Sequence, residues 1–547
     1  MHWVAPSEKN NGNSNGTLEK RLWDAADQFR ANSGLKSQEY SAPVLGLIFL
    51  RFAEVRFAAQ RAKLEKAAAN NGKGNLPRRG SRVDEPAAYH AEGVLYLTPN
   101  ARFDYLLSLP EAADAGKTVN DAMRDIEKHN PQLAGVLPKT YNLFTSTLLK
   151  ELLKKVSEIP ATVDYDAFGR IYEYFLGEFA RTEGQKGGEF YTPGCIVRFL
   201  TEVIEPYHGR ILDPACGSGG MFVSSARFVS EHKRNPSSEL AIHGVEKTDE
   251  TGRLCRMNLA VHGLEGEIRH GGNVNSYYDD PHDATDNFDF VLANPPFNVN
   301  AVDKERLKDS VGPGRRFPFG LPRTDNANYL WIQIFYSALN VQGRAGFVMA
   351  NTACDGNTDE KLRRQLIETR AVDAIVAVGS NMFYTVILPC ALWFLDRGKA
   401  NTSRADQVLF VDARHIYRQI DRTHRDWTPA QVGFLANLIR LHRGETPDLT
   451  IGGDEARAQL ERTFGKTPRY SDIAGLCRVV RLDEIERRGW SLNVGLYVGV
   501  APGKQVAGED FEAQFGALTE QLEILNTEAQ KLGEAIVAQA AKLLDLC

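Results

Sequence analysis

The stretch FDFVLANPPF at residues 288–297 decides the fold, because its apolar run ends abruptly in a carboxamide, two prolines and an aromatic ring. The run is short and rich in β-favouring residues, which is typical of a central parallel strand covered on both faces. Two consecutive prolines cannot continue the hydrogen-bonded ladder, so the chain must leave the sheet there. We therefore predict a buried strand at 288–293 whose carboxyl end delivers a functional site.

The turn that follows this strand suits chemistry on a planar amine. The lone pair of an aromatic amino nitrogen is delocalised into the ring, so the nitrogen must be re-aimed before it can attack. The side-chain oxygen of Asn294 and the carbonyl of Pro295 can both accept from such an amino group, while Phe297 can stack on the base. The ring of Pro296 adds stiffness. An ordinary strand-ending turn is the alternative that this stretch alone leaves open.

Downstream of residue 164, short apolar segments alternate with helical patterns. The predicted strands are residues 210–213, 241–246, 267–270, 288–293, 345–350, 372–378 and 390–395. Alternation of this kind predicts an α/β fold with a doubly wound, Rossmann-like sheet. Such sheets bind ligands at the carboxyl ends of their strands, near the switch in strand order, which is where the Asn294 turn is expected.

Four regions follow from the pattern along the chain. We predict a disordered tail at 1–16, a helical domain at 17–160, the α/β domain at 161–500 and a helix at 501–547. Apolar residues of the last region alternate at spacings of four and three, which is a heptad seam and favours a coiled-coil partner. A helix packed on its own domain remains the alternative.

Composition sets further bounds on the class of protein. With 547 residues the chain is long enough for two or three domains, and its net charge of -5 gives no global nucleic-acid signature. Any DNA contact must therefore come from a local patch or from a partner chain. The seven cysteines are scattered, so we predict no metal site and a reducing compartment. No apolar run is long enough to span a bilayer, and we expect a cytoplasmic protein without membrane contact.

A second candidate site lies on the strand at 210–213, which runs into a glycine-rich turn. Asp213 ends the strand, and Gly217, Ser218, Gly219 and Gly220 let a ligand approach the backbone at a helix N-terminus. The next strand ends in Glu246, an acid placed where it can hold a ribose diol, and Asn273 after the third strand can face an adenine edge. A surface glutamate and an ordinary Gly-Asn turn are the alternatives.

Two further segments have open interpretations. The stretch QKGGEFYTP at 185–193 can form a lid over a small cofactor, or a helix entry with Thr192 as the N-cap and Pro193 in the first turn, and both interpretations can hold together. Residues 298–325 carry basic residues among Gly, Pro and Phe. They are either a solvated loop or a basic, aromatic-bearing flap that follows a nucleic-acid backbone.

Three motifs together carry a resemblance to a known family. GEFYTP at 188–193, DPACGSG at 213–219 and NPPF at 294–297 closely resemble the modification (M) subunit of type I restriction-modification systems, an adenine-specific DNA methyltransferase. The likeness extends over most of the chain. Two departures are Gly379-Ser380 in place of the usual Leu-Pro pair, and NAN at 326–328 in place of the more common Asn-Ala-Asp.

The resemblance implies S-adenosylmethionine as methyl donor and the exocyclic amino group of an adenine flipped out of double-stranded DNA as acceptor. It implies a methyltransferase catalytic domain at 161–500 in which Asn294, Pro295, Pro296 and Phe297 hold the base. The residues predicted to hold the cofactor are Glu189, Phe190, Tyr191, Thr192, Pro193, Gly194, Asp213, Gly217, Ser218, Gly219, Gly220, Glu246 and Asn273.

The resemblance also implies partners. A separate specificity (S) subunit would choose the target sequence and engage the helix at 501–547, with two M chains for each S chain and a restriction (R) subunit as a further partner. Two rival functions stay open on the motifs alone. One is methylation of a protein glutamine amide or of RNA, because Asn-Pro-Pro-aromatic turns serve amide and amine nitrogens alike; the other is a scaffold without catalysis.

Overall fold

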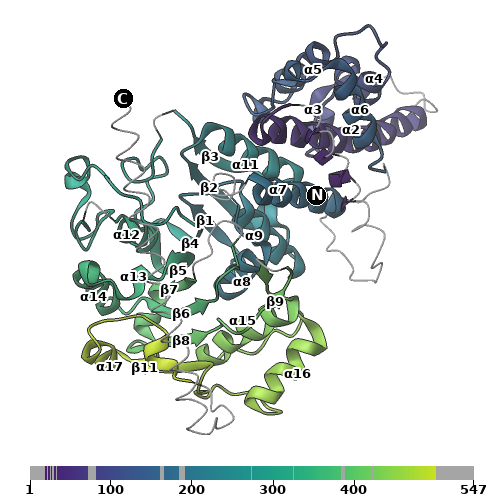
Figure 1. Ribbon diagram of the computed structural model, residues 1–547. Coiled ribbons are helices and arrows are strands. Elements are labelled where there is room, and N and C mark those ends of the chain that lie inside the picture. Colours follow the sequence, from purple (N-terminus) through teal and green to yellow (C-terminus); the bar gives the residue numbers. More distant parts are fainter. Residues whose placement is uncertain are drawn as a thin grey trace, which may run out of the picture.

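The computed structural model describes residues 19–500 except 21, 25, 28–29, 32–33, 72–81, 161–164, 184–190, 273, 324–325, 384–388 and 422–423. Within these residues a helical region stands beside a large α/β unit (Figure 1). The predicted tail at 1–16 and the predicted partner helix at 501–547 lie outside the described residues.

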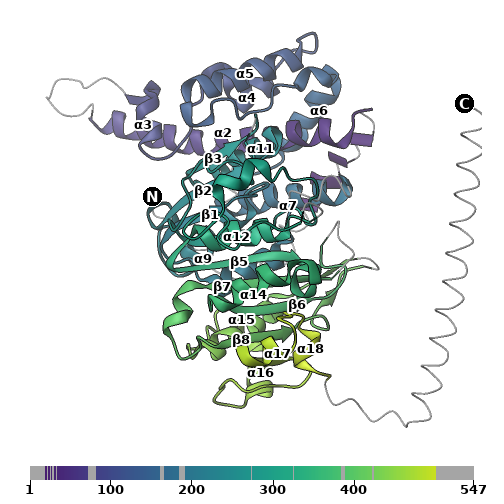
Figure 2. The same cartoon turned by 90° about the vertical axis from the view of Figure 1, so that its left-hand side faces the viewer.

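The helical region is built on one long helix, α2, and smaller helices around it (Figure 2). Its helices are α2 (Ser37–Asn71), α3 (Pro86–His90), α4 (Phe103–Leu107), α5 (Ala115–His129) and α6 (Ser146–Ser157). Helix α7 (Tyr165–Glu183) packs Phe168 and Phe175 into the same core, and α11 of the α/β unit adds Leu254 and Met257. One hydrophobic core therefore crosses the junction between the two parts.

Nine strands form a single sheet in the order β11-β8-β6-β7-β5-β4-β1-β2-β3. The strands are β1 (Gly209–Asp213), β2 (Leu240–Glu246), β3 (Gly266–His270), β4 (Phe288–Ala293), β5 (Leu339–Ala350), β6 (Val372–Val378), β7 (Cys390–Asp396), β8 (Gln407–Asp412) and β11 (Cys477–Arg481). All neighbours pair in parallel except for β7, which is antiparallel to β5 and β6, and β11, which is antiparallel to β8. This confirms the predicted doubly wound α/β class.

All seven predicted strands are present. Six begin within one residue of the prediction, whereas β5 begins at Leu339 rather than at residue 345. Two strands of the sheet, β8 and β11, were not predicted, nor was the short ribbon of β9 (Arg418–Gln419) and β10 (Arg425–Asp426). Strand β4 is the buried central strand that its sequence indicated, since Phe288, Val291, Leu292 and Ala293 are inaccessible to solvent.

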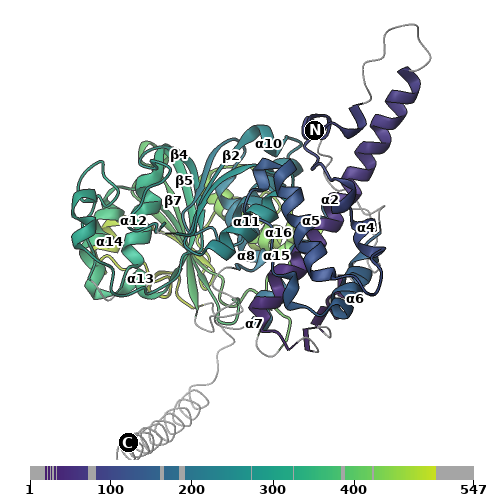
Figure 3. The same ribbon diagram turned by 90° about the horizontal axis from the view of Figure 1, so that it is seen from above.

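Helices cover both faces of the sheet, which Figure 3 shows nearly edge-on. One face carries α8 (Gly194–Ile204), α9 (Gly220–Glu231), α11 (Asp249–Val261), α15 (Pro429–Arg443) and α16 (Gly453–Phe464). The other carries α12 (Asn328–Ala338), α13 (Thr352–Asp355), α14 (Glu360–Glu368), α17 (Leu482–Arg487) and α18 (Gly495–Val498). The short helix α10 (Pro236–Glu239) precedes β2. Each face has its own hydrophobic core, as expected for a sheet buried on both sides.

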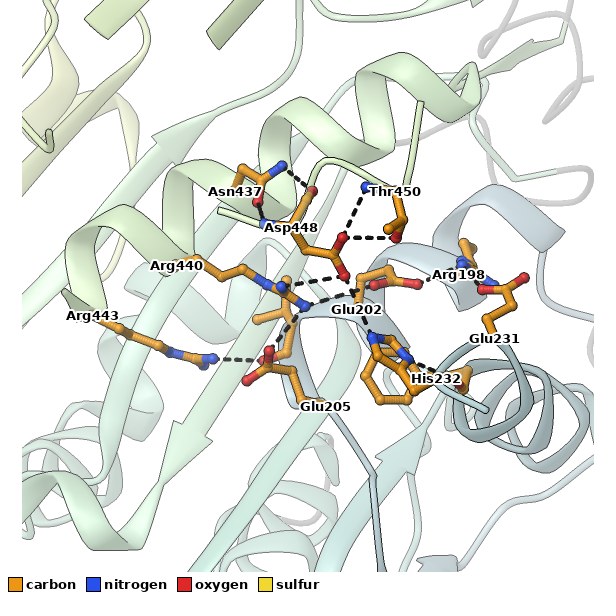
Figure 4. A network of polar contacts seen from close by, with 12 residues as sticks. Arg198, Glu202, Glu205, Glu231, His232, Asn437, Arg440, Arg443, Asp448 and Thr450 are labelled. Atoms are coloured by element: carbon orange, nitrogen blue, oxygen red, sulfur yellow. Dashed lines mark hydrogen bonds and ion pairs between the residues drawn. The ribbon is translucent and has the colours of Figure 1, made fainter. Parts of the chain in front are cut away.

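A network of buried charges fixes α8 against α15 (Figure 4). Arg198 and Glu202, one turn apart on α8, form an ion pair of 2.7 Å, and Arg440 of α15 lies 2.9 Å from Glu205 at the end of α8. Arg440 also approaches Asp448 at 3.6 Å. Because removing one partner would leave a buried charge uncompensated, the network holds α8 in one position on the sheet. The first residue of α8, Gly194, follows the TP pair of the predicted lid motif.

Candidate active site

The two predicted turns meet at one edge of the sheet. Strands β1 and β4 are adjacent and parallel, with Ile211 opposite Phe290 and Leu212 opposite Val291. Their carboxyl ends therefore lie together. From this pair the strand order runs outward through β2 and β3 on one side and through β5 on the other. This is the topological switch point at which doubly wound sheets bind ligands.

A pocket occupies this switch point. Its walls come from the lid motif, from the glycine turn after β1 and from the turn after β4, and its lining residues are Tyr191, Thr192, Asp213, Ala215, Cys216, Gly217, Ser218, Gly220, Met221 and Asn294. Residues from three motifs that together span more than 100 positions of the sequence thus share one cavity. The glycine turn and the polar tip of β4 are close enough to act on the same reaction.

Within the described residues, one side-chain hydrogen bond orients Asn294. Its Nδ2 donates to Oγ1 of Thr192 at 3.1 Å. Its Oδ1 is buried and accepts no hydrogen bond within the described part of the chain. A buried acceptor without a donor costs about 1–3 kcal/mol of folding free energy, so a ligand donor that meets it recovers that cost. The site therefore holds a fixed acceptor ready for an N–H group.

The rest of the turn after β4 gives this acceptor a rigid frame. Pro295 is buried, Pro296 is exposed and Phe297 is half-buried, in contact with the cores on both faces of the sheet. The ring of Phe297 is thus held by packing while part of it remains accessible. This arrangement is compatible with stacking on a planar ligand, as predicted from the sequence.

The glycine turn after β1 is stabilised by backbone hydrogen bonds. Asp213 Oδ1 accepts from the N–H of Ala215 at 3.0 Å, and the N–H of Gly219 donates to the carbonyl of Cys216 at 2.8 Å. Gly217 and Gly219 have φ values of 52° and 83°, which L side chains rarely adopt. A Cβ on Gly219 would lie 2.8 Å from Sγ of Cys255. The turn therefore needs glycine at Gly219 for both its conformation and its space.

Glu246, at the end of β2, is joined to this turn. Its Oε2 accepts from the N–H of Gly217 at 3.1 Å and its Oε1 from the N–H of Thr248 at 2.8 Å. Burial raises the pKa of the Glu246 carboxyl, and these hydrogen bonds oppose the shift. Because each carboxylate oxygen can accept more than one hydrogen bond, Glu246 retains acceptor capacity for a diol.

The predicted lid motif is only partly described. Glu189 and Phe190 lie outside the described residues, as does Asn273 after β3. The alternative in which Thr192 caps the helix is wrong: the N-cap of α8 is Pro193, no side chain caps it, and the Thr192 hydroxyl faces Asn294 instead. Thr192 is thus part of the site itself.

The sequence prediction missed three residues that line the pocket. Ala215 and Cys216 lie inside the glycine-rich motif, between residues that were predicted, and Met221 directly follows the last of these, Gly220. Their position in that motif was the available signal. Their apolar side chains carry no ligand chemistry of their own, in contrast to the polar residues and glycines beside them.

Part of the basic segment after β4 packs into the fold, so its described residues are not a fully solvated loop; a flap that follows a nucleic-acid backbone stays a prediction. Leu307 and Phe317 are buried, and the nearly buried Arg316 lies 3.0 Å from Asp280. Burial lowers the pKa of Arg316. Arg316 is therefore an internal anchor of this segment. Four other cations of the segment are exposed: Arg306, Lys308, Arg315 and Arg323.

The buried carboxyl of Asp213 predicts how the free energy of unfolding changes with pH. Burial raises the pKa of its carboxyl to about 8, so the folded protein holds a proton there that the unfolded chain, with a pKa of about 3.9, releases. Stability from this group is present below about pH 4 and is lost as pH rises towards 8, by up to about 1.4 kcal/mol per pH unit. We expect Asp213→Asn to remove this slope while keeping the acceptor for Ala215.

The measurement is urea unfolding of both proteins between pH 5 and pH 8 without added ligand. The variant should gain stability over the parent steadily across this range. Parallel pH profiles for the two proteins would show that Asp213 is ionised in the fold.

The sequence matches known families over nearly its whole length. A family model described as N-6 DNA Methylase matches residues 163–505, and one described as the HsdM N-terminal domain matches residues 18–158. The type I restriction enzyme MjaIX methylase subunit of Methanocaldococcus jannaschii is 34% identical over 532 residues, which cover 94% of this chain and 89% of that one. The HindI methylase subunit of Haemophilus influenzae is 33% identical over 401 residues, 70% of this chain and 83% of that one.

The fold is also found among solved structures. The methyltransferase subunit of a type I restriction-modification system from Streptococcus thermophilus superposes with a TM-score of 0.68 at 22% identity, covering 89% of this chain and all of that one. Together with the pocket at the switch point, these matches define the class: the chain belongs to the N-6 DNA methylase family and is a DNA methyltransferase. Within that family it is a methylase (M) subunit of the type I restriction-modification systems, as the motifs indicated.

No helix among the described residues is both long enough and apolar enough to cross a bilayer.

Proposed function

We propose that this subunit transfers a methyl group from S-adenosylmethionine to the exocyclic amino group of an adenine extruded from double-stranded DNA, at a target chosen by a separate specificity subunit. One observation carries the proposal: the buried, unpartnered Oδ1 of Asn294 lies in the same pocket as the glycine turn after β1. An acceptor is what an amino nitrogen needs, and a glycine turn is what a nucleoside cofactor needs.

The residues of the β1 and β2 ends fit the proposed cofactor. The backbone of Gly217 to Gly220 leaves room for close approach at the start of α9, and Glu246 retains acceptor capacity for a ribose. The cofactor supplies an electrophilic methyl group bonded to a sulfonium sulfur. Asp213, which lines the same pocket, offers a carboxyl that ionises more readily beside such a cation.

The turn after β4 would act on the base. Asn294 Oδ1 accepts one N–H of the adenine amino group and the carbonyl of Pro295 accepts the other, which draws the nitrogen lone pair out of the ring plane towards the methyl group. The Asn294 amide gives its nitrogen to the Thr192 hydroxyl, which leaves the oxygen to face the substrate. Phe297 stacks on the extruded base and keeps it in line.

The DNA backbone would meet the exposed cations of the segment after β4. Arg306, Lys308, Arg315 and Arg323 follow the catalytic turn in the sequence, and they are solvent-accessible. Because the whole chain has a net charge of -5, such a local cluster is needed to attract phosphates. The basic segment therefore remains our candidate for backbone contact, with Arg316 as its internal support.

The test of the proposed function is methylation of plasmid DNA by the purified complex of this subunit with its specificity subunit. We expect N6-methyladenine at one sequence motif, detected by sequencing, and none when the cofactor is omitted. Label from methyl-labelled cofactor that appears only on protein or on RNA would contradict the proposal and support the rival substrates.

Partner binding gives a second prediction. We propose that the heptad helix at 501–547 engages the specificity subunit, that two of these subunits share one specificity subunit, and that a restriction subunit joins them. Deleting residues 505–547 is expected to abolish co-purification with the specificity subunit, because the apolar seam would be lost. The truncated chain should keep its unfolding transition and its affinity for S-adenosylmethionine. Unchanged co-purification would contradict this assignment.

A further inference from the structure

A reciprocal pair of carboxamides stands directly behind the catalytic turn. The backbone N–H of Asn298 donates to Oδ1 of Asn328 at 2.9 Å, and Nδ2 of Asn328 donates to Oδ1 of Asn298 at 2.9 Å. Asn328 is the first residue of α12 and is 1% exposed. Both functional groups of the Asn328 amide are thus used on one neighbour.

Other contacts tie the same point to the next strand. Thr352, just after the end of β5, directs its Oγ1 at Oδ1 of Asn298 at 3.5 Å, and the backbone N–H of Ala327 donates to the carbonyl of Val299 at 2.9 Å. Asn326 accepts from the N–H of Asn328 at 2.9 Å. The exit of the β4 turn is therefore fastened to α12, which packs beside β4 and β5 (Figure 1).

The pair acts on the residue that follows Phe297. Asn298 has a φ of 52°, a left-handed conformation that asparagine tolerates better than most residues. At the other end of the turn, Asn294 is held by Thr192. The four-residue turn is therefore anchored at both ends, and the second anchor sets the direction in which the chain leaves Phe297.

We propose that Asn328 is a positioning residue for methyl transfer: its amide pair with Asn298 fixes the catalytic turn so that Phe297 and the Asn294 acceptor meet the base in the reactive geometry. The inference rests on the proposed function, since it concerns the base that the turn would hold. Asn328 touches neither substrate nor cofactor, so its effect belongs to the rate of the chemical step and not to ligand affinity.

The hydrogen bond between the two side chains needs one donor and one acceptor, so single and double variants are expected to behave differently. In Asn298→Asp, the new carboxylate still accepts from Asn328 Nδ2. In Asn328→Asp, the carboxylate still accepts the Asn298 N–H, and the Asn298 side chain can flip to donate its Nδ2. In the double variant, two carboxylates face each other and the donor within the pair is lost, which leaves the longer contacts to residue 298 from Asn326 Nδ2 at 3.4 Å and Thr352 Oγ1 at 3.5 Å.

The experiment is a double-mutant cycle on the full complex with the specificity subunit, read as the single-turnover rate of methyl transfer at saturating cofactor and DNA. We expect each single variant to stay within about threefold of the parent rate and the double variant to fall about 100-fold, the cost of a misplacement of roughly 1 Å at a reacting centre. Cofactor affinity should be unchanged within twofold, because the glycine turn is untouched.

A matched control comes from the helical region. There Asn120 Oδ1 accepts from the N–H of Tyr141 at 3.2 Å, and Asn120 Nδ2 donates to Oδ1 of Asn142 at 3.4 Å. The double variant Asn120→Asp with Asn142→Asp makes the same chemical change far from the catalytic edge. We expect it to lower the unfolding midpoint without slowing methyl transfer.

The outcomes separate the possible failures. If the fold-loss of rate in the double variant equals the product of the two single-variant fold-losses, the positioning role is overturned. The same holds if the control double variant loses as much rate as the Asn298–Asn328 double variant. If the parent complex transfers no methyl group to DNA adenine, the proposed function fails, and the positioning role of Asn328 is overturned with it.

Discussion

Alanine in place of Asn294 is expected to slow single-turnover methyl transfer by about 10²–10³-fold while leaving the affinity for S-adenosylmethionine within a few-fold of the parent. The reason is that Oδ1 of Asn294 is the buried acceptor without a donor, and it gains most when the amino nitrogen changes geometry during the reaction. On the proposed assignment, cofactor affinity depends mainly on the β1 and β2 ends, whose residues are unchanged in this variant although Asn294 lines the same pocket. Calorimetric binding and a quenched-flow methylation assay measure the two quantities separately.

Thr192 supplies the matched comparison for this variant. Thr192→Val keeps the Asn294 oxygen but removes the acceptor for its Nδ2, so the amide is free to turn, and we expect a loss of about tenfold. Thr192→Ser keeps the hydroxyl and should approach the parent rate. Near-normal turnover of the Asn294→Ala enzyme would refute the role given to this carboxamide.

Gly219→Ala is expected to destabilise the fold by about 2–5 kcal/mol and to abolish measurable cofactor binding. The substitution forces an L side chain to adopt a φ of 83° and places its Cβ 2.8 Å from the buried Sγ of Cys255. A left-handed conformation costs about 1–2 kcal/mol and overpacking of a core about 1–3 kcal/mol. Relief of the clash requires the turn to shift, and this turn lines the pocket proposed for the cofactor. Chemical unfolding and equilibrium binding report the two effects.

Gly220 tests whether this loss is specific. A Cβ there would meet no atom within 4 Å in the described structure, and the residue is the first of helix α9, where alanine is favourable. Gly220→Ala should therefore keep the stability of the parent. Any loss of affinity in that variant would measure contact with the ligand alone. If Gly219→Ala kept the parent's stability and its affinity for the cofactor, the close contact between the turn and Cys255 would not contribute to either free energy.

Much of the sheet was predictable because its strands carry their burial in their own sequence. The fully buried β6 and the abrupt end of β4 are local signals, and both strands were predicted at their observed positions. Strand β8 has the same apolar signal and was readable, although it was not predicted. Strand β11 is different. Only two of its five residues, Cys477 and Val480, are buried, and it pairs with β8, more than 60 positions earlier, so its existence depends on a distant partner.

The candidate site, like the sheet, has features that local sequence predicts and features that depend on distant residues. The identity of the chemistry lay in short motifs, and a shared edge for their turns followed from parallel strand topology. The hydrogen bond from Asn294 to Thr192 joins residues 102 positions apart, and the internal ion pair of Arg316 requires knowing which carboxylate lies next to it. A basic residue in a loop does not reveal by itself whether water or a buried aspartate surrounds it. These pairings belong to tertiary structure and not to local sequence.

The ion pairs between α8 and α15 have a consequence for purification of the protein. Glu202 is inaccessible to solvent and Arg440 is 5% exposed, so dissolved ions cannot come between them as they do between surface charges. Contacts to DNA phosphates, by contrast, weaken steeply with rising ionic strength. Washing with concentrated sodium chloride should therefore strip contaminating nucleic acid from a column-bound preparation and leave an enzyme that still melts at its usual temperature.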